Sequence, residues 1–212
     1  MKKLKIGRIF IILILLSIFI LISAISYVDA VSNNIADSVF RLHVIANSDS
    51  EEDQKLKLKV RDELLSYMNI ISKDSISKEE AMQIANEHKE EFKQIAEKVI
   101  KENGYNYTVN VQIGKADFPT KYYGDITLPA GTYDALKVQI GHAKGQNWWC
   151  VMFPPLCFVD VSTGIVPDNS KQELKQRLND EEYDLISKTD DNEISFKFKI
   201  VEFFQNWKLG NK

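Results

Sequence analysis

The residues best suited to covalent chemistry are the two cysteines, which lie close together in the segment NWWCVMFPPLCF at residues 147–158. Cys150 could act as a nucleophile if a nearby imidazole kept its thiol ionised, and either His142 or His43 could supply that base. However, Cys150 does not begin a predicted helix, and no recognised thiol-hydrolase signature surrounds it. A secreted thiol hydrolase or cell-wall enzyme that uses Cys150 is therefore an alternative function and not the main expectation.

The same two cysteines could instead form a disulfide, as is common in exported proteins. A straight strand would separate the Cα atoms of Cys150 and Cys157 by roughly 23 Å, whereas bridgeable Cα atoms lie within about 7 Å of each other. The chain must therefore reverse direction at residues 152–155, and a hairpin that pairs Val151 with Leu156 would bring the cysteines together. The open alternative is that both are buried free thiols.

Two adjacent tryptophans in this segment are candidates for contact with a partner. Neighbouring strand residues point to opposite faces, so one of Trp148 and Trp149 can lie in the core while the other faces outward. Pro154 and Pro155 would stiffen an exposed rim beside them, and an exposed tryptophan next to a rigid turn is typical of an interaction hot spot. The alternative is that the protein's own helix and loop cover both rings.

Other chemistry has less support. The three histidines have no short ligand spacing, and the cysteines lack the partners of a zinc site, so we expect no metal ion and no cofactor. His88 is predicted in the middle of a helix, and His43, flanked by Arg41, on the polar face of a strand. The acidic residues that follow Ser48 are expected to cap a helix and complement its dipole, with Ser48 or Asp49 as the capping residue.

The N-terminus has the pattern of an export signal. Four basic residues within the first eight precede an almost wholly apolar run at residues 9–25. Small residues at 28–30 offer a cleavage site, so residues 1–30 are predicted to be a signal peptide or, if uncleaved, a signal anchor that contacts the membrane through residues 9–25. The early cations predict that the N-terminus stays in the cytoplasm while the rest of the chain crosses.

The remainder, residues 31–212, is long enough for one domain with its own core. The first 30 residues contain four of the 27 basic residues and one of the 30 acidic residues, so the remainder carries a net charge near −6. Nucleic acid is therefore not an expected partner, because no basic patch with interleaved aromatic residues is present.

The elements that must position these residues can be read from hydrophobic periodicity. A strand is predicted at 39–46, followed by a helix at about 50–69 and a second long helix from Ser77 to Asn103. Further strands are predicted at 105–113, 132–140 and 194–201, with strand, turn and strand at 148–161, a long connection at 118–131 and a helix at 170–186. Segregated helices and consecutive strands favour an α+β fold, in which two long helices pack on one face of a mostly antiparallel sheet.

Three segments resemble the stage II sporulation protein R family: FRLHVIANSDSEEDQ at residues 40–54, FPTKYYGDITLPAGTYDALKVQIG at 118–141, and the cysteine segment at 147–158. The resemblance extends from about Arg41 to Asp160. It fades in the C-terminal tail, apart from FKIVEFFQ at residues 198–205.

The resemblance implies that the protein is a signal and not an enzyme. Members of this family are made in the forespore of endospore-forming bacteria and exported into the space between forespore and mother cell. There they activate a membrane-embedded aspartic protease of the mother cell, which processes the precursor of sigma-E. The expected location is this intermembrane space, with attachment to the membrane if the N-terminal segment is retained.

The family blocks also supply the candidate partner-binding residues, which are Trp148, Trp149, Pro154, Pro155, Arg41, His43, Asn47 and Asp49. The hypothesis is that this domain binds the extracytoplasmic side of the protease and favours its active arrangement. A third interpretation, besides activator and thiol enzyme, is a passive envelope protein tethered by its N-terminal segment.

Overall fold

A four-stranded sheet forms the centre of the protein, as seen in a computed structural model that describes residues 2–156, 166 and 168–187. Its strands, in the spatial order β2-β5-β1-β6, are β2 (Val109–Phe118), β5 (Gly131–Ile140), β1 (Phe40–Ile45) and β6 (Asn147–Phe153). The pairs β2–β5 and β1–β6 are antiparallel, whereas β1 and β5 are parallel. The predicted α+β class is confirmed, with the refinement that the sheet is mixed.

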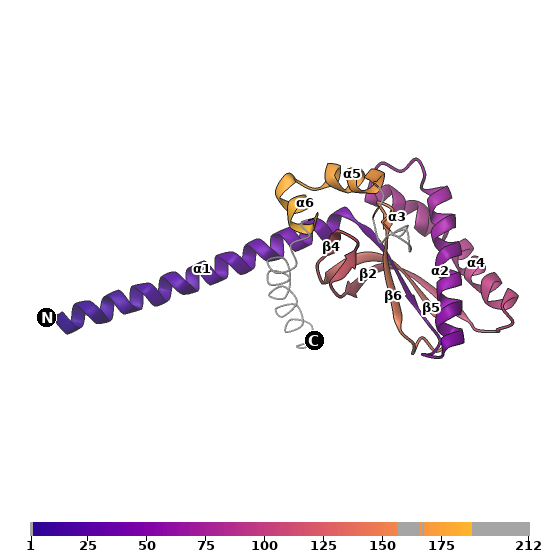
Figure 1. Cartoon of the computed structure of the whole chain (residues 1–212), viewed down its shortest axis with the longest axis horizontal. Helices are drawn as coiled ribbons and strands as arrows, with labels where there is room; N and C mark the ends of the chain where they lie inside the picture. The colour runs from indigo at the N-terminus through magenta and orange to yellow at the C-terminus, as the bar shows by residue number, and fades with distance from the viewer. Residues whose placement is uncertain (1, 157–165, 167, 188–212) are drawn as a thin grey trace.

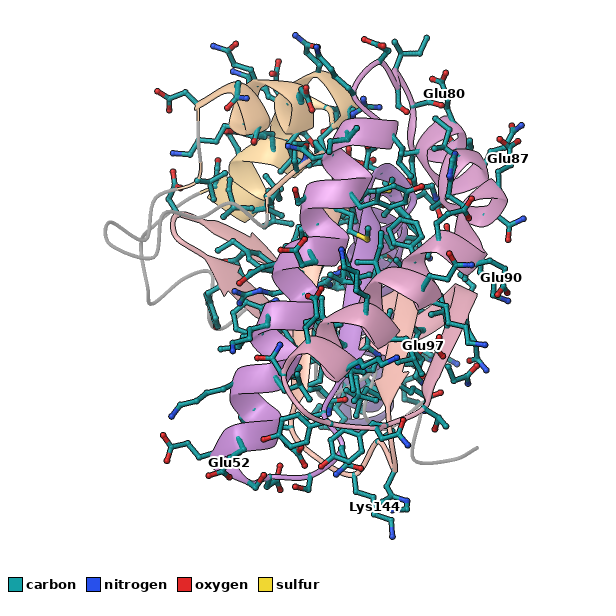
Figure 2. The ribbon with its side chains drawn as sticks, turned by 90° about the vertical axis from the view of Figure 1, so that its right-hand side faces the viewer. Glu52, Glu80, Glu87, Glu90, Glu97 and Lys144 are labelled. Atoms are coloured by element: carbon teal, nitrogen blue, oxygen red, sulfur yellow. The ribbon has the colours of Figure 1, made fainter. Side chains whose placement is uncertain are left out.

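One face of the sheet is covered by three helices, α2 (Glu51–Ile71), α3 (Lys78–Glu87) and α4 (Lys89–Glu102). Figures 1 and 2 show α2 and α4 lying across the strands. Apolar side chains of these helices, such as Leu64 and Phe92, pack against the strands in the first of two cores. The helix at 50–69 was well predicted, but its capping residue is Ser50, which accepts the amide N–H of Asp53, and is neither Ser48 nor Asp49.

The prediction of one long helix from Ser77 to Asn103 is wrong, because the helix is interrupted at His88. His88 lies at the end of α3 and the start of α4, and its Nδ1 is hydrogen-bonded to the hydroxyl of Tyr67 on α2 at 2.8 Å. His88 is therefore a half-buried junction residue, and only its predicted position in the middle of a helix is wrong.

The opposite face of the sheet is also covered, which the sequence did not predict. The covering elements are the C-terminal end of α1 (Lys2–Ser38), the hairpin β3 (Lys121–Tyr123) with β4 (Ile126–Leu128), and the helices α5 (Asp168–Arg177) and α6 (Asp180–Ser187). Figure 1 shows the end of α1, with β4 and α6, on the side of the strands away from α2 and α4. Arg41 and His43, predicted on a polar face, are instead buried, with exposed fractions of 0% and 8%.

The connection predicted at residues 118–131 contains the β3–β4 hairpin, which turns at Gly124 with a φ of 59°. The strand predicted at 105–113 begins later, at Val109, and the stacked rings of Tyr105 and Tyr107 precede it. The chain turns after Phe153 as predicted. The second arm of that hairpin and the strand predicted at 194–201 lie outside the described residues.

Helix α1 is continuous from the N-terminal apolar segment into the second core. In Figure 1 its N-terminal part projects away from the sheet, and its apolar side chains from Ile9 to Ile22 are exposed, whereas Val31, Ile35 and Ala36 are buried. Over the described part of the chain, no helix meets the length and hydropathy needed to cross a membrane. The division into residues 1–30 and 31–212 stays a prediction.

Candidate functional site

The two tryptophans lie on opposite faces of β6. Trp149 is in register with His43 on β1, and Trp148 is in register with Val44. Trp148 packs against the helix-covered core, where the guanidinium carbon of Arg61 lies 4.2 Å from its ring centroid. Trp149 packs on the other face, where Lys121 Nζ lies 4.3 Å from the ring centroid. Both rings are half-buried, so elements of the protein itself cover each of them in part.

Arg41 is the largest fully buried side chain of the described residues. Its guanidinium carbon lies 4.0 Å from the ring centroid of Phe118 and 4.5 Å from that of Tyr133, within the range of cation–π attraction. Its Nη2 donates a hydrogen bond to the Tyr123 hydroxyl at 2.7 Å. Nε and Nη1 are buried and have no hydrogen-bond partner. Such a charge is costly to bury, because water is lost without replacement.

His43 follows Arg41 by two residues on the same face of β1. Its Nε2 is hydrogen-bonded to Asn147 Oδ1 at 2.7 Å, and its ring stacks on Trp149 with centroids 5.8 Å apart. Burial lowers the pKa of His43, and the charges of Lys137 and Arg41 add to this effect, although the bond to Asn147 opposes it. The second ring nitrogen, Nδ1, is buried without a partner, and so is Nε1 of Trp149.

These side chains form one group, which we call the Arg41 cluster. It comprises Arg41, His43, Phe118, Lys121, Tyr123, Tyr133 and Trp149. The Tyr123 hydroxyl joins two of its members, since it accepts from Arg41 and donates to the carbonyl oxygen of Trp149 at 3.2 Å. Burial and the charge of Arg41 lower the pKa of Lys121, and burial raises the pKa of Tyr133. The cluster therefore combines basic groups with N–H donors that have no acceptor.

Four of these residues were missed in the sequence: Phe118, Lys121, Tyr123 and Tyr133. All four lie in the segment at 118–141, which resembles the family and was predicted to contain a long connection, but none of these side chains was a candidate. The available signal was its density of aromatic residues, because two phenylalanine or tyrosine rings next to a buried cation are a common arrangement.

Asn47 and Asp49 do not lie in this cluster but join two loops at one end of the sheet. Asn47 donates to Asp53 Oδ2 at 2.8 Å, and its own oxygen accepts the amide N–H of His142 at 2.9 Å. Asp49 accepts the amide N–H of Gln146 at 2.7 Å. Their observed contacts are thus internal, and their contact with a partner stays a prediction.

The same loops approach so closely that glycine is required. A Cβ atom on Gly145 would lie 2.1 Å from the carbonyl oxygen of Ser48. Burial by itself would raise the pKa of Asp53, but hydrogen bonds from Ser48, Asn47 and Tyr107 hold it below its ordinary value. This carboxylate is therefore a stable acceptor at the centre of the loop junction.

Pro154 and Pro155 do not form the exposed rim that was predicted. Pro154 is buried and Pro155 is half-buried, and the carbonyl oxygen of Pro155 accepts a hydrogen bond from Ser170 on α5 at 2.7 Å. The prolines are covered because α5 packs beside the end of β6. A groove of about 530 Å³ lies next to them, between the end of α2, residues 152–155 and α5.

Cys150 is not placed for catalysis with either candidate base. It is 2% exposed in the helix-covered core, in register with Leu42, so it lies on the face of the sheet opposite His43. His142 is exposed on the loop after β5. Cys150 is disulfide-bonded, and its predicted partner Cys157 lies outside the described residues. Within the described ranges, no three side chains of the metal-ligating types gather in a group.

Comparison with known proteins identifies the family. The family model described as stage II sporulation protein R matches residues 36–163, which include all four strands of the sheet and the whole Arg41 cluster. A curated relative, stage II sporulation protein R of Bacillus subtilis (strain 168), is 43% identical over 130 residues, which are 61% of this chain and 58% of the relative. No solved structure matches. The chain belongs to the stage II sporulation protein R family and is thus related to sporulation proteins.

Proposed function

We propose that this protein is exported from the forespore and activates a membrane-embedded aspartic protease of the mother cell, which then processes the sigma-E precursor. The observation that carries the proposal is the family match over residues 36–163, because it spans the sheet and both groups of candidate residues. The alignment with the Bacillus subtilis relative covers 58% of that protein. The activity and the partner of the whole relative are therefore extended to this chain only as part of the proposal.

Export is supported by the N-terminal sequence. Basic residues precede an apolar segment, and the apolar side chains of α1 from Ile9 to Ile22 find no cover in the protein. A long exposed apolar surface of this kind is typical of a segment that contacts lipid or the export machinery. The proposed location is the space between the two cells, with attachment to the membrane if residues 9–25 are retained.

Activation by contact requires only that the protein binds one arrangement of the protease more tightly than another. Such differential affinity shifts the population toward the favoured arrangement, and no covalent step is needed. The proposed contact is the accessible edge of the Arg41 cluster, where Lys121 and Trp149 are half-buried and Tyr122 is 66% exposed. Aromatic side chains at such an edge commonly supply much of the binding energy.

The test is reconstitution in a non-sporulating host. The full chain is co-expressed with the candidate protease and the sigma-E precursor, and the shortened precursor is measured by immunoblot. Trp149→Ala should reduce processing at least tenfold, because a central aromatic contact contributes about 2 kcal/mol or more. The matched control is Trp148→Ala, which alters the helix-covered face. Both variants must first be shown to be folded.

Two results would contradict the proposal in different ways. Processing without this chain would remove the activator role altogether. Equal processing by the wild type and Trp149→Ala would exclude this edge as the contact. The thiol-enzyme alternative is tested in the same system: it predicts that Cys150→Ser abolishes function while Cys157→Ser does not, whereas a disulfide between them predicts similar losses.

A further inference from the structure

The Arg41 cluster has an excess of hydrogen-bond donors over acceptors. Arg41 Nε and Nη1 and Trp149 Nε1 are buried without a partner, although buried N–H groups in proteins are almost always bonded. Among the described residues, no carboxylate pairs with Arg41, and the groups around its guanidinium are aromatic rings and the hydroxyls of Tyr123 and Tyr133. Cation–π attraction offsets part of the cost of burying this charge but accepts no hydrogen bond.

We propose that the Arg41 cluster is a carboxylate-binding site, in which Arg41 and Trp149 donate to the oxygens of an acidic side chain presented by a partner protein. A carboxylate supplies only acceptors, and its negative charge would match that of the buried guanidinium of Arg41, which has no ion-pair partner among the described residues. Hydrogen bonds between a guanidinium and a carboxylate are also roughly twice as strong as neutral ones. The assignment of the carboxylate to a partner rests on the proposed function, whereas the site itself does not.

The β3–β4 hairpin provides the route to these buried donors. Its two three-residue strands pair with each other and form a sheet separate from the central one. The Tyr123 hydroxyl accepts from Arg41 and donates to the Trp149 carbonyl oxygen, and Lys121 lies over the Trp149 ring. The hairpin is also anchored in the second core by the buried side chains of Ile126 and Leu128. Entry of a carboxylate would require displacement of this hairpin, and the charged ligand would then replace the neutral Tyr123 hydroxyl as the acceptor for Arg41. Lys121 at the entrance adds a second positive charge for the approaching anion.

The experiment uses the full chain, ¹⁵N-labelled and kept in a neutral detergent, with side-chain N–H signals followed by NMR. Sodium acetate should shift the Arg41 Nε–H and Trp149 Nε1–H signals along a saturable curve. The internal control is the pair Arg61 and Trp148 on the opposite face, which should not shift. Trp148 Nε1 is also buried without a partner, but the guanidinium beside its ring already has a carboxylate partner in Asp62. Sodium chloride at equal ionic strength should produce no saturable change.

Variants separate a specific site from a general charge effect. Arg41→Gln should abolish acetate binding, while Arg61→Gln should leave it unchanged. Trp149→Phe keeps the ring and removes one donor, so it should weaken binding about tenfold and serves if Arg41→Gln does not fold. Equal shifts at Trp148 and Trp149, or a linear response identical to that of chloride, would overturn the site.

Further titrations identify the source of the carboxylate. A short peptide containing glutamate should bind at least as tightly as acetate, and the same peptide with glutamine should not bind. Binding of inorganic phosphate in preference to acetate would overturn the assignment to a carboxylate, and acetate binding without binding of the glutamate peptide would overturn a protein source.

Processing assays then separate this inference from the proposed function. If Arg41→Gln loses acetate binding but still supports processing of the sigma-E precursor, the acidic side chain of the protease is excluded as the ligand while the activator role stands. If processing never depends on this chain, the proposed function fails and the acetate result is unaffected.

Discussion

The two faces of the central sheet treat buried positive charge in opposite ways. On the face covered by α2, α3 and α4, Lys78 lies 2.7 Å from Asp134 Oδ2, and Lys57 donates to Gln54 and to the carbonyl oxygen of Gln146. On the other face, Arg41 has a single hydrogen bond and no carboxylate partner among the described residues. The buried cations of the helix-covered face therefore have polar partners, whereas the guanidinium of Arg41 keeps two N–H groups without an acceptor.

The outer surfaces differ as well. Glu80, Glu87 and Glu90 are exposed on α3 and α4, and Figure 2 shows their side chains pointing away from the protein. The entrance to the Arg41 cluster instead has the basic side chain of Lys121. An acidic partner segment would be repelled by the first surface and attracted by the second, which gives such a partner one preferred side of the sheet.

The largest loss of stability is expected for Asp134→Asn, on the face of the sheet covered by α2, α3 and α4. Lys78 would lose its closest counter-charge and keep only the longer contacts to Asp37 and Glu79, at 3.9 and 3.8 Å. Breaking such a buried pair from one side costs about 3 kcal/mol of unfolding free energy. Urea denaturation measures the change. Lys115→Gln is the control, because Lys115 also contacts Asp134 but is 55% exposed and should matter much less. Equal losses in both variants would mean that burial of the pair does not determine its contribution.

A somewhat smaller effect is expected where the loops meet at the end of the sheet. Gly145→Ala places a Cβ atom 2.1 Å from the Ser48 carbonyl oxygen, and the resulting backbone shift should cost about 2 kcal/mol. Gly114→Ala on β2 is the matched control, since nothing lies within 4 Å of its Cβ position. A thermal melt in which both variants resemble the wild type would show that the loop junction adjusts without strain.

The pH dependence of the unfolding free energy should depend on His43, which lies on the same face of the sheet as Arg41. Because burial and nearby charges lower the pKa of His43 from its ordinary value of 6.5, the unfolded chain takes up a proton at higher pH than the folded protein does. Stability should therefore be highest above pH 6.5, fall as the pH decreases toward the folded pKa, and then level off. His43→Gln should flatten this part of the profile. The prediction fails if His43→Gln keeps the slope, or if only the exposed His142→Gln removes it.

The smallest effect on stability, and the one that tests the contrast between the faces most directly, is expected for Arg41→Met. An unpaired buried charge is replaced by an apolar side chain of similar length, so the unfolding free energy should change by less than about 1 kcal/mol or increase. Activation of the protease should nevertheless be lost. A large destabilisation would show that Arg41 is a structural residue and that the two faces do not differ in kind.

Elements with a regular hydrophobic period along several turns or residues are well predicted from the sequence. The strand at 39–46 and the helix at 50–69 have this periodicity, and both are present. Burial of Arg41 and His43 could not be predicted, because their residue types favour a polar face and the elements that cover them leave little periodic signal. Strands β3 and β4 have only three residues each. The interruption at His88 depends on a bond to Tyr67 in another helix, which local patterns do not contain.

Several residues of the candidate site could be predicted from the sequence, but not that they lie close together in space. The segments that contain Arg41, His43 and Trp149 were all selected, yet they gather only because β1 lies between β5 and β6. That order depends on pairing between Leu42 and Leu136 and between His43 and Trp149. Contacts over such separations are decided by the packing of the whole sheet and not by any local sequence pattern.

The continuity of α1 has a consequence for how the protein matures. The helix passes without interruption through residues 28–30, where cleavage is predicted, and Val31 already belongs to the second core. A peptidase cuts an extended chain, so a folded α1 would hide that bond from it. If the N-terminal segment is removed as proposed, folding of α1 and cleavage would be competing reactions, and their relative rates would set the fraction of molecules that is released and the fraction that keeps the segment.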